Sequence, residues 1–294
     1  MIKSFTPAAL ALVLAASSAL AQDDSAQLAG LIEKVSPSIV NVRVVLKVEV
    51  SMNGQVVQNA EERSQMAGVV VDAGGLIMIS NSTISAARMN KSKMFAARGL
   101  SASIVPTNMK VILNGEEEEH AAFLAASDSD LDLAFIQLEK TDGLTLTPVS
   151  FADAPKPTIG QRLVQITRLS EGFDYAAHFS LGRVSGRIKK PRKAWVVTGA
   201  LGGAGLPIYS NDGAVMGVLT SLESGVADGG SMMGGAGGGG QATGVPVLVG
   251  SKKVRGVLAQ AKTRALEVAA ERAKGGDEKK DEAPASQPAP APGK

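Results

Sequence analysis

The stretch GGAGLPIYSNDGAVMGV, residues 202–218, begins with a glycine turn and continues through two short apolar segments. These segments, residues 206–210 and 213–222, are rich in the aliphatic and β-branched side chains that favour strands. Asp212 and Gly213 lie at their junction, and an Asp-Gly pair between apolar runs is typical of a tight hairpin turn. The stretch therefore predicts a glycine turn that leads directly into a β-hairpin.

Apolar or β-branched runs separated by turn residues recur along most of the chain, as expected of strands. Besides the two above, they cover residues 38–50, 66–80, 109–115, 120–127, 132–139, 161–169, 179–188, 194–199 and 242–250. About a dozen strands are too many for one flat sheet, and this number favours barrels. A short amphipathic helix is predicted over residues 28–35, and only residues 254–274 predict a longer one.

Three segments differ in composition from the predicted strands. Residues 85–106 contain Met, Lys and Arg, and their structure is left open. Residues 225–244, with GGSMMGGAGGGG, predict a flexible loop, because glycine offers no side chain to bury. Residues 275–294, GGDEKKDEAPASQPAPAPGK, predict a disordered tail.

The N-terminus has the features of a secretory signal peptide over residues 1–21. Lys3 precedes an apolar run over residues 8–14, and Ala19 and Ala21 form an A-x-A cleavage pattern. The run is too short to span a bilayer core of about 30 Å. The chain has no cysteine, so an exported form would rely on its hydrophobic core alone. We expect a bacterial periplasmic or secreted protein without a transmembrane helix.

The formal net charge of +2 gives no reason to expect nucleic acid or an acidic membrane as a partner. No motif predicts a cofactor or a metal site. The acidic run at residues 116–119 is typical of a solvated face, although such a run can also hold a cation. The basic run RIKKPRK, residues 187–193, is either a solvated hairpin tip or a surface that steers an acidic partner.

Six blocks, in order, resemble trypsin-like serine proteases of the HtrA/Deg type. They are VSPSIVNVRV (35–44), GVVVDAGGLIMISNSTIS (68–85), ASDSDLDLAFIQLE (126–139), FSLGRVSGR (179–187), the opening stretch (202–218) and ATGVPVLVGSKKVRGVLAQAK (242–262). The resemblance covers residues 28–262. It implies an all-β fold of two six-stranded antiparallel barrels with a cleft between them and short flanking helices.

The same resemblance implies a division of the chain. Residues 28–145 would form the first barrel and residues 146–262 the second. Residues 263–294 would form a helical extension and the disordered Pro/Ala tail. No segment resembling the family's peptide-binding PDZ modules follows the closing helix.

Two members of the family's catalytic triad are missing here. The nucleophilic serine aligns with Ala204, and the histidine aligns with Ser82 if no gap is allowed, or with Thr83 if the pair SN at residues 80–81 is matched to the family's Thr-Asn. Only the aspartate is retained, as Asp132. Alanine has no attacking oxygen, and a hydroxyl is no general base at neutral pH. We therefore expect Asp132 to anchor nearby backbone, or Ser82, by hydrogen bonds.

Other groups offer no evident replacement. His120 follows the acidic run and is expected to be solvated, while His178 precedes a strand of the second barrel, on the wrong side of the cleft. Gly202, Gly203 and Ala204 occupy the turn that supplies the family's oxyanion donors, so these backbone groups remain a candidate residual site. The alternative is a tight glycine turn with no ligand.

These observations favour an exported, catalytically inactive protease-fold domain that binds proteins or peptides or acts as a scaffold. One alternative is a serine endopeptidase with a rearranged active site. Another is a regulatory subunit of an active HtrA-like paralogue, and a homo-trimer would fit the resemblance. The sequence does not name the ligand or the partner.

Overall fold

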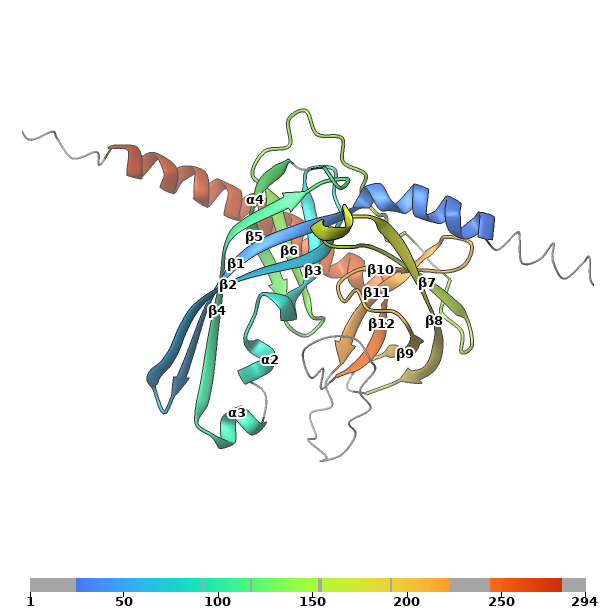
Figure 1. Ribbon diagram of the computed structural model, residues 1–294, viewed down its shortest axis with the longest axis horizontal. Coiled ribbons are helices and arrows are strands. Elements are labelled where there is room, and N and C mark those ends of the chain that lie inside the picture. Colours follow the sequence, from blue (N-terminus) through green and yellow to red (C-terminus); the bar gives the residue numbers. More distant parts are fainter. Residues whose placement is uncertain are drawn as a thin grey trace, which may run out of the picture.

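The computed structural model describes residues 25–90, 93–116, 118–152, 155–190, 192–222 and 244–281. Within this part of the chain, twelve strands close into two antiparallel barrels of six strands each (Figure 1). The sequence prediction of an all-β fold with two six-stranded antiparallel barrels is therefore confirmed. The predicted signal peptide at residues 1–21 lies outside the described residues, as does the glycine-rich loop up to residue 243.

The first barrel has the strand order β1-β2-β3-β6-β5-β4. Its strands are β1 (Ile39–Met52), β2 (Gln55–Val70), β3 (Leu76–Ser80), β4 (Leu100–Ile112), β5 (Glu119–Asp128) and β6 (Leu133–Leu138). The second barrel has the order β10-β11-β12-β9-β8-β7. Its strands are β7 (Arg162–Arg168), β8 (Ala177–Ile188), β9 (Ala194–Gly199), β10 (Pro207–Tyr209), β11 (Val215–Leu222) and β12 (Val245–Gly250).

Short helices connect or flank the strands. They are a helix over residues 25–35, η1 (Ser36–Ser38), η2 (Asn81–Thr83), α2 (Ala87–Asn90), α3 (Lys93–Ala97) and η3 (Glu171–Phe173). The segment at residues 85–106, left open by the sequence, contains α2, α3 and the first part of β4. The amphipathic helix predicted over residues 28–35 is confirmed.

The alternation of side chains along each strand divides the apolar residues into three cores. The interior of the first barrel contains Val40, Val42 and Ile136, and the interior of the second contains Leu163 and Ile208. A third core lies between the barrels and under the flanking helices. Its members include Leu28, Ile39, Phe135, Val164, Ile166, Leu206, Val254, Ala261 and Ala265. The two barrels therefore share a continuous apolar contact.

Helix α4 (Ser251–Asp281) is longer than predicted. It contributes Val254, Ala261 and Ala265 to the core between the barrels. The helix therefore packs on the barrels at least as far as Ala265. It also continues past Gly275, where the sequence predicted disorder, because each added residue completes one more helical hydrogen bond. Residues 282–294 lie outside the described part. Among the described helices, none combines the length and apolar character needed to cross a membrane.

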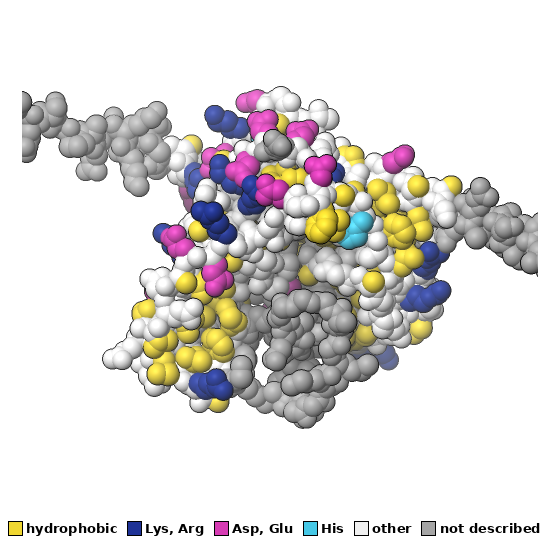
Figure 2. Space-filling model, viewed as in Figure 1, with side chains coloured by type: hydrophobic (Ala, Val, Ile, Leu, Met, Phe, Trp, Pro, Cys, Tyr) yellow, Lys and Arg dark blue, Asp and Glu magenta, His cyan; other side chains and the backbone are white. Residues whose placement is uncertain are grey.

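Strands β1, β2 and β4 continue beyond the first barrel as a three-stranded arm, drawn at the lower left of Figure 1. We define the arm as residues 46–64 and 100–107. It exposes Met52, Val56, Val57 and Val105, each about half accessible to solvent. Figure 2 shows hydrophobic side chains gathered over this region. The arm thus presents apolar surface that the barrel itself does not cover.

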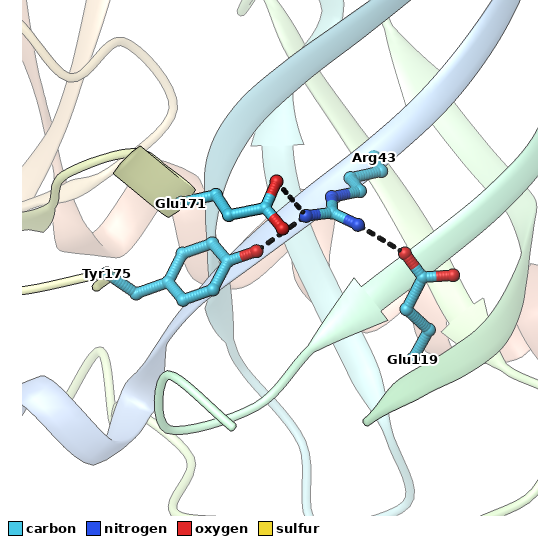
Figure 3. Close-up of polar contacts among 4 residues, drawn as sticks. All are labelled: Arg43, Glu119, Glu171 and Tyr175. Carbon is cyan, nitrogen blue, oxygen red and sulfur yellow. Dashed lines mark hydrogen bonds and ion pairs between the residues drawn. The ribbon is translucent and has the colours of Figure 1, made fainter. Parts of the chain in front are cut away.

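Polar contacts also join the two barrels. Arg43 of β1 donates to Glu119 of β5 at 2.6 Å, and it pairs with Glu171 at 2.7 Å (Figure 3). It also donates to the hydroxyl of Tyr175 at 2.7 Å. The hydrogen bond to Glu119 is the main cause that raises the pKa of Arg43. Since Glu171 and Tyr175 lie between β7 and β8, this cluster links the first barrel to the second.

Candidate functional site

The barrels approach each other closely at Gly205, which directly follows Ala204. A Cβ on Gly205 would lie 2.7 Å from the carbonyl carbon of Ile79 and would also overlap the backbone nitrogen of Ser80. Gly205 has φ +82°, a conformation that glycine adopts without strain. The glycine turn of the second barrel thus lies against the end of β3. Ser82 and Thr83, the two candidates for the histidine position, follow directly in η2.

Asp132 lies in the turn that directly precedes β6, with φ 59° and only 6% of its surface exposed. Its carboxylate accepts the Ser82 N–H at 2.7 Å and the hydroxyls of Ser82 and Ser80 at 3.2 Å each. Its carbonyl oxygen accepts the Asn81 N–H at 3.1 Å. As the sequence predicted, Asp132 anchors nearby backbone and Ser82.

Of the two alignments for the histidine position, Ser82 is the residue that meets the carboxylate of Asp132. Thr83 is the next residue of η2 and is half-buried. In a working triad, the aspartate accepts an imidazole N–H and holds the ring toward the nucleophile. Here the same carboxylate is occupied by a backbone amide and two hydroxyls. The arrangement fixes the loop that carries Ser82.

The turn at residues 202–206 places each of its N–H groups on an internal acceptor. Gly202 and Gly203 both donate to Oε1 of Gln165, at 3.1 and 3.0 Å. Ala204 donates to the Gly202 carbonyl at 3.2 Å, Gly205 to that of Leu219 at 2.8 Å, and Leu206 to that of Gly203 at 3.2 Å. The candidate oxyanion turn at Gly202, Gly203 and Ala204 is therefore satisfied from within the molecule.

Leu206, at the end of the turn, is fully buried. Its Cδ1 lies close to Gly203, because a Cβ there would be 2.6 Å away. Ala204 is half-buried and carries only a methyl group. The turn therefore holds its shape by packing and hydrogen bonds, and its side chains provide no nucleophile.

Arg192, from the loop between β8 and β9, is half-buried in the same part of the molecule. It donates to the hydroxyl of Thr220 at 3.5 Å, and its Nε is buried with no hydrogen-bond partner among the described residues. Burial lowers the pKa of Arg192, while attraction to Asp128, Asp130 and Asp132 opposes this shift. Arg192, part of the basic run at residues 187–193, is therefore half-buried and close enough to these carboxylates to feel their charge, so the run is not merely a solvated tip.

Neither histidine lies in this site. His120 is on β5 beside Glu118, at 4.0 Å, and His178 is on β8 opposite Thr167. The expectation that His120 is solvated is wrong, since only 12% of its side chain is exposed. Its position on a strand packed against β4 buries the ring.

Sequence reasoning missed three residues of this region: Ser80, Gln165 and Arg192. Ser80 had a usable signal, because it lies two positions before Ser82 and therefore near the same carboxylate. Gln165 had none, since it meets the glycine turn only through the pairing of β7 with β10. Arg192 was one of five positive charges in its run, and nothing in the sequence distinguished it from the others.

Comparison with known families agrees with this geometry. The model of the trypsin-like peptidase domain matches residues 66–218, just over half of the chain. The match runs from the end of β2 into β11 and includes Ser82, Asp132 and Ala204. The chain therefore belongs to the trypsin-like peptidase family. No curated protein matches it significantly.

Proposed function

We propose that this chain is a catalytically inactive, HtrA/Deg-type member of its family that acts as an exported protein- or peptide-binding domain. The observation that carries the proposal is the presence of Ala204 at the nucleophile position together with Ser82 on the carboxylate of Asp132. Acyl transfer on this fold needs an attacking oxygen and a base that accepts its proton. Neither Ala204 nor Ser82 supplies these functions.

The HtrA/Deg assignment rests on the six sequence blocks, which follow the order expected for that type. Export to the periplasm or outside the cell rests on the signal-peptide pattern of residues 1–21. The absence of cysteine agrees with a protein that needs no disulfides in an oxidising compartment. These parts of the proposal are independent of the site chemistry.

A binding role is supported by the arm. Exposed apolar side chains at Met52, Val56, Val57 and Val105 lie on strands that leave the barrel. Apolar surface of this kind is typical of protein contact sites. A domain that has lost its chemistry but retains such a surface can hold an unfolded or extended partner without cleaving it.

The test of inactivity uses the purified chain with quenched fluorescent casein. We expect no hydrolysis above buffer, and no mass increase after treatment with a fluorophosphonate that labels activated serines. Trypsin serves as the positive control in both assays. Casein hydrolysis that the fluorophosphonate abolishes would refute inactivity and support a rearranged active site.

The test of binding follows the fluorescence anisotropy of labelled, unfolded casein. We expect the Val56→Ser, Val57→Ser variant to bind at least about fivefold more weakly, since each exposed valine contributes apolar area to the contact. The matched control is Ile159→Ser, because Ile159 is 71% exposed but lies outside the arm. Equal losses in both variants would contradict a role for the arm.

A further inference from the structure

The geometry points to Gln165 as an internal ligand of the glycine turn, which holds the N–H groups of Gly202 and Gly203 toward the interior of the second barrel and so keeps them from a bound peptide carbonyl. The inference deepens the proposed function, because it explains how the oxyanion turn is closed. It rests on the proposed function, whereas its test measures the amides of the turn and not activity.

The strand pattern explains why Gln165 reaches the turn. Val164 and Ile166 on either side belong to the core between the barrels, whereas Leu163 points into the second barrel. Side chains alternate along a strand, so Gln165 shares the inward side with Leu163. It is fully buried, and a buried amide needs hydrogen-bond partners.

The turn supplies those partners in both directions. Oε1 of Gln165 accepts from Gly202 and Gly203, while Nε2 donates to the carbonyl of Gly203 at 2.7 Å. A substrate's peptide carbonyl is also an amide oxygen, so Oε1 is chemically the same acceptor. Because Gln165 is fully buried on the same face of β7 as Leu163, it keeps these two N–H groups directed into the second barrel.

The position of Gln165 also explains the shape of the turn. Its two-way contact fixes Gly203, which in turn packs on Leu206. Gly205 is then directed against Ser80 and the Asp132 loop. Gln165 is thus a positioning residue for the turn as well as its ligand.

The test is hydrogen exchange of the full chain, labelled with 15N-glycine, measured by NMR. In Gln165→Met, a side chain of similar size without the acceptor, we expect the amides of Gly202 and Gly203 to exchange at least about tenfold faster. The amide of Gly205 should keep its protection, because its acceptor is Leu219. Unchanged exchange at Gly202 and Gly203 would overturn the proposal.

Gln165→Glu keeps the test decisive if the methionine variant folds poorly. Its carboxylate still accepts from Gly202 and Gly203, so their protection should remain within about threefold of the wild type. It cannot donate to the Gly203 carbonyl until it is protonated, so its melting temperature should approach that of the wild type as the pH falls from 7 to 5. Loss of protection at both glycines in this variant would also overturn the proposal.

The matched control is Gln161→Met. Gln161 lies just before β7; its Oε1 accepts the Thr158 N–H at 3.0 Å, and its Nε2 lies 4.0 Å from Sδ of Met216. We expect it to leave Gly202 and Gly203 unchanged. Faster exchange there would mean that any loss of a glutamine near β7 loosens the turn, and it would overturn the specific role of Gln165.

Discussion

Ala204 lies at the position that aligns with the catalytic serine, within a turn that is well ordered by hydrogen bonds. The turn around it has N–H groups satisfied internally, and the residue itself ends in a methyl group. Restoring an oxygen at this position changes the chemistry only if a base can reach it. Ser82, which the alignment places at the histidine position, lies beside the carboxylate of Asp132 and is a position that could hold such a base.

We predict that Ala204→Ser alone gives no fluorophosphonate adduct and no casein hydrolysis, because triad members act as a unit. Ala204→Ser with Ser82→His should show weak labelling at most, since Gln165 still occupies the turn. Intact mass spectrometry measures both. An adduct in the single variant would reveal a base elsewhere and contradict the proposed inactivity.

Gly205 gives a second prediction at the residue scale. Gly205→Ala should lower the free energy of unfolding by about 3 kcal/mol or more, because a left-handed φ and overlap with Ile79 and Ser80 act together. Urea denaturation measures the change. Gly54→Ala is the control, since Gly54 has φ +83° but open space around it, and it should cost only about 1 kcal/mol. Equal costs would argue against the close approach of the barrels.

At the scale of elements, α4 is attached to the first barrel by charged as well as apolar contacts. Lys262 forms an ion pair with Asp72, which follows β2, and Arg272 pairs with Glu139 at 2.7 Å. Arg272 also lies over the ring of Phe123, with 4.8 Å to the centroid. These contacts add to the apolar contacts of the core residues in holding the helix against the barrel.

The pair between Asp72 and Lys262 predicts a pH dependence. Its hydrogen bond lowers the pKa of Asp72, so the stabilisation is present above the unfolded value of about 3.9 and is lost as the pH falls through the folded value. Asp72→Asn should therefore be less stable than the wild type at pH 7, by at most about 1 kcal/mol because the pair is partly exposed. The difference should shrink below about pH 4.

Urea denaturation at pH 7 and pH 3 checks this prediction. Asparagine can still accept the Gly74 N–H that Asp72 accepts at 2.8 Å, so the substitution isolates the charge. Lys262→Met and the double variant complete a mutant cycle. A deficit that persists unchanged at pH 3, or additive effects in the cycle, would contradict the role of the ion pair.

The elements also show where sequence reasoning succeeds. The described strands, apart from most of β2 and the first part of β4, could be expected from local patterns because their apolar residues repeat at strand spacing, as in residues 161–169. Residues 55–65 of β2 were missed because most of them face solvent on both sides of the arm. Asp132 and Ser82 were found through the resemblance. Gln165 was not, because its role depends on a turn almost forty residues later in the sequence.

At the scale of the whole molecule, Arg168 of β7 joins the barrels through backbone carbonyls. It donates to Ile39 and Ser36 at 2.8 Å each and to Tyr175 at 3.1 Å. Ser36 precedes β1 and Ile39 is its first residue. One side chain of the second barrel therefore supplies hydrogen-bond donors to backbone carbonyls at the start of the first barrel. Burial lowers the pKa of Arg168.

We predict that Arg168→Met lowers the free energy of unfolding by about 2–4 kcal/mol, because it leaves buried carbonyls without donors. Arg183→Met is the matched control: Arg183 is exposed and donates only to the Gly160 carbonyl in the described structure, at 2.9 Å. Its substitution should cost about 0.5 kcal/mol or less. Urea unfolding curves measure both, and similar losses would contradict a special role for Arg168.

The closure of each barrel has a kinetic consequence. Val42 pairs with Val111, and Gln165 pairs with Ile208, so strands that meet are separated by long stretches of chain. The core between the barrels is completed only by α4, near the end of the sequence. With such a high contact order, the chain loses the entropy of closing long loops before the stabilising contacts between distant strands can form. We therefore expect refolding on the scale of milliseconds to seconds or slower, with the last helix docking after both barrels have formed.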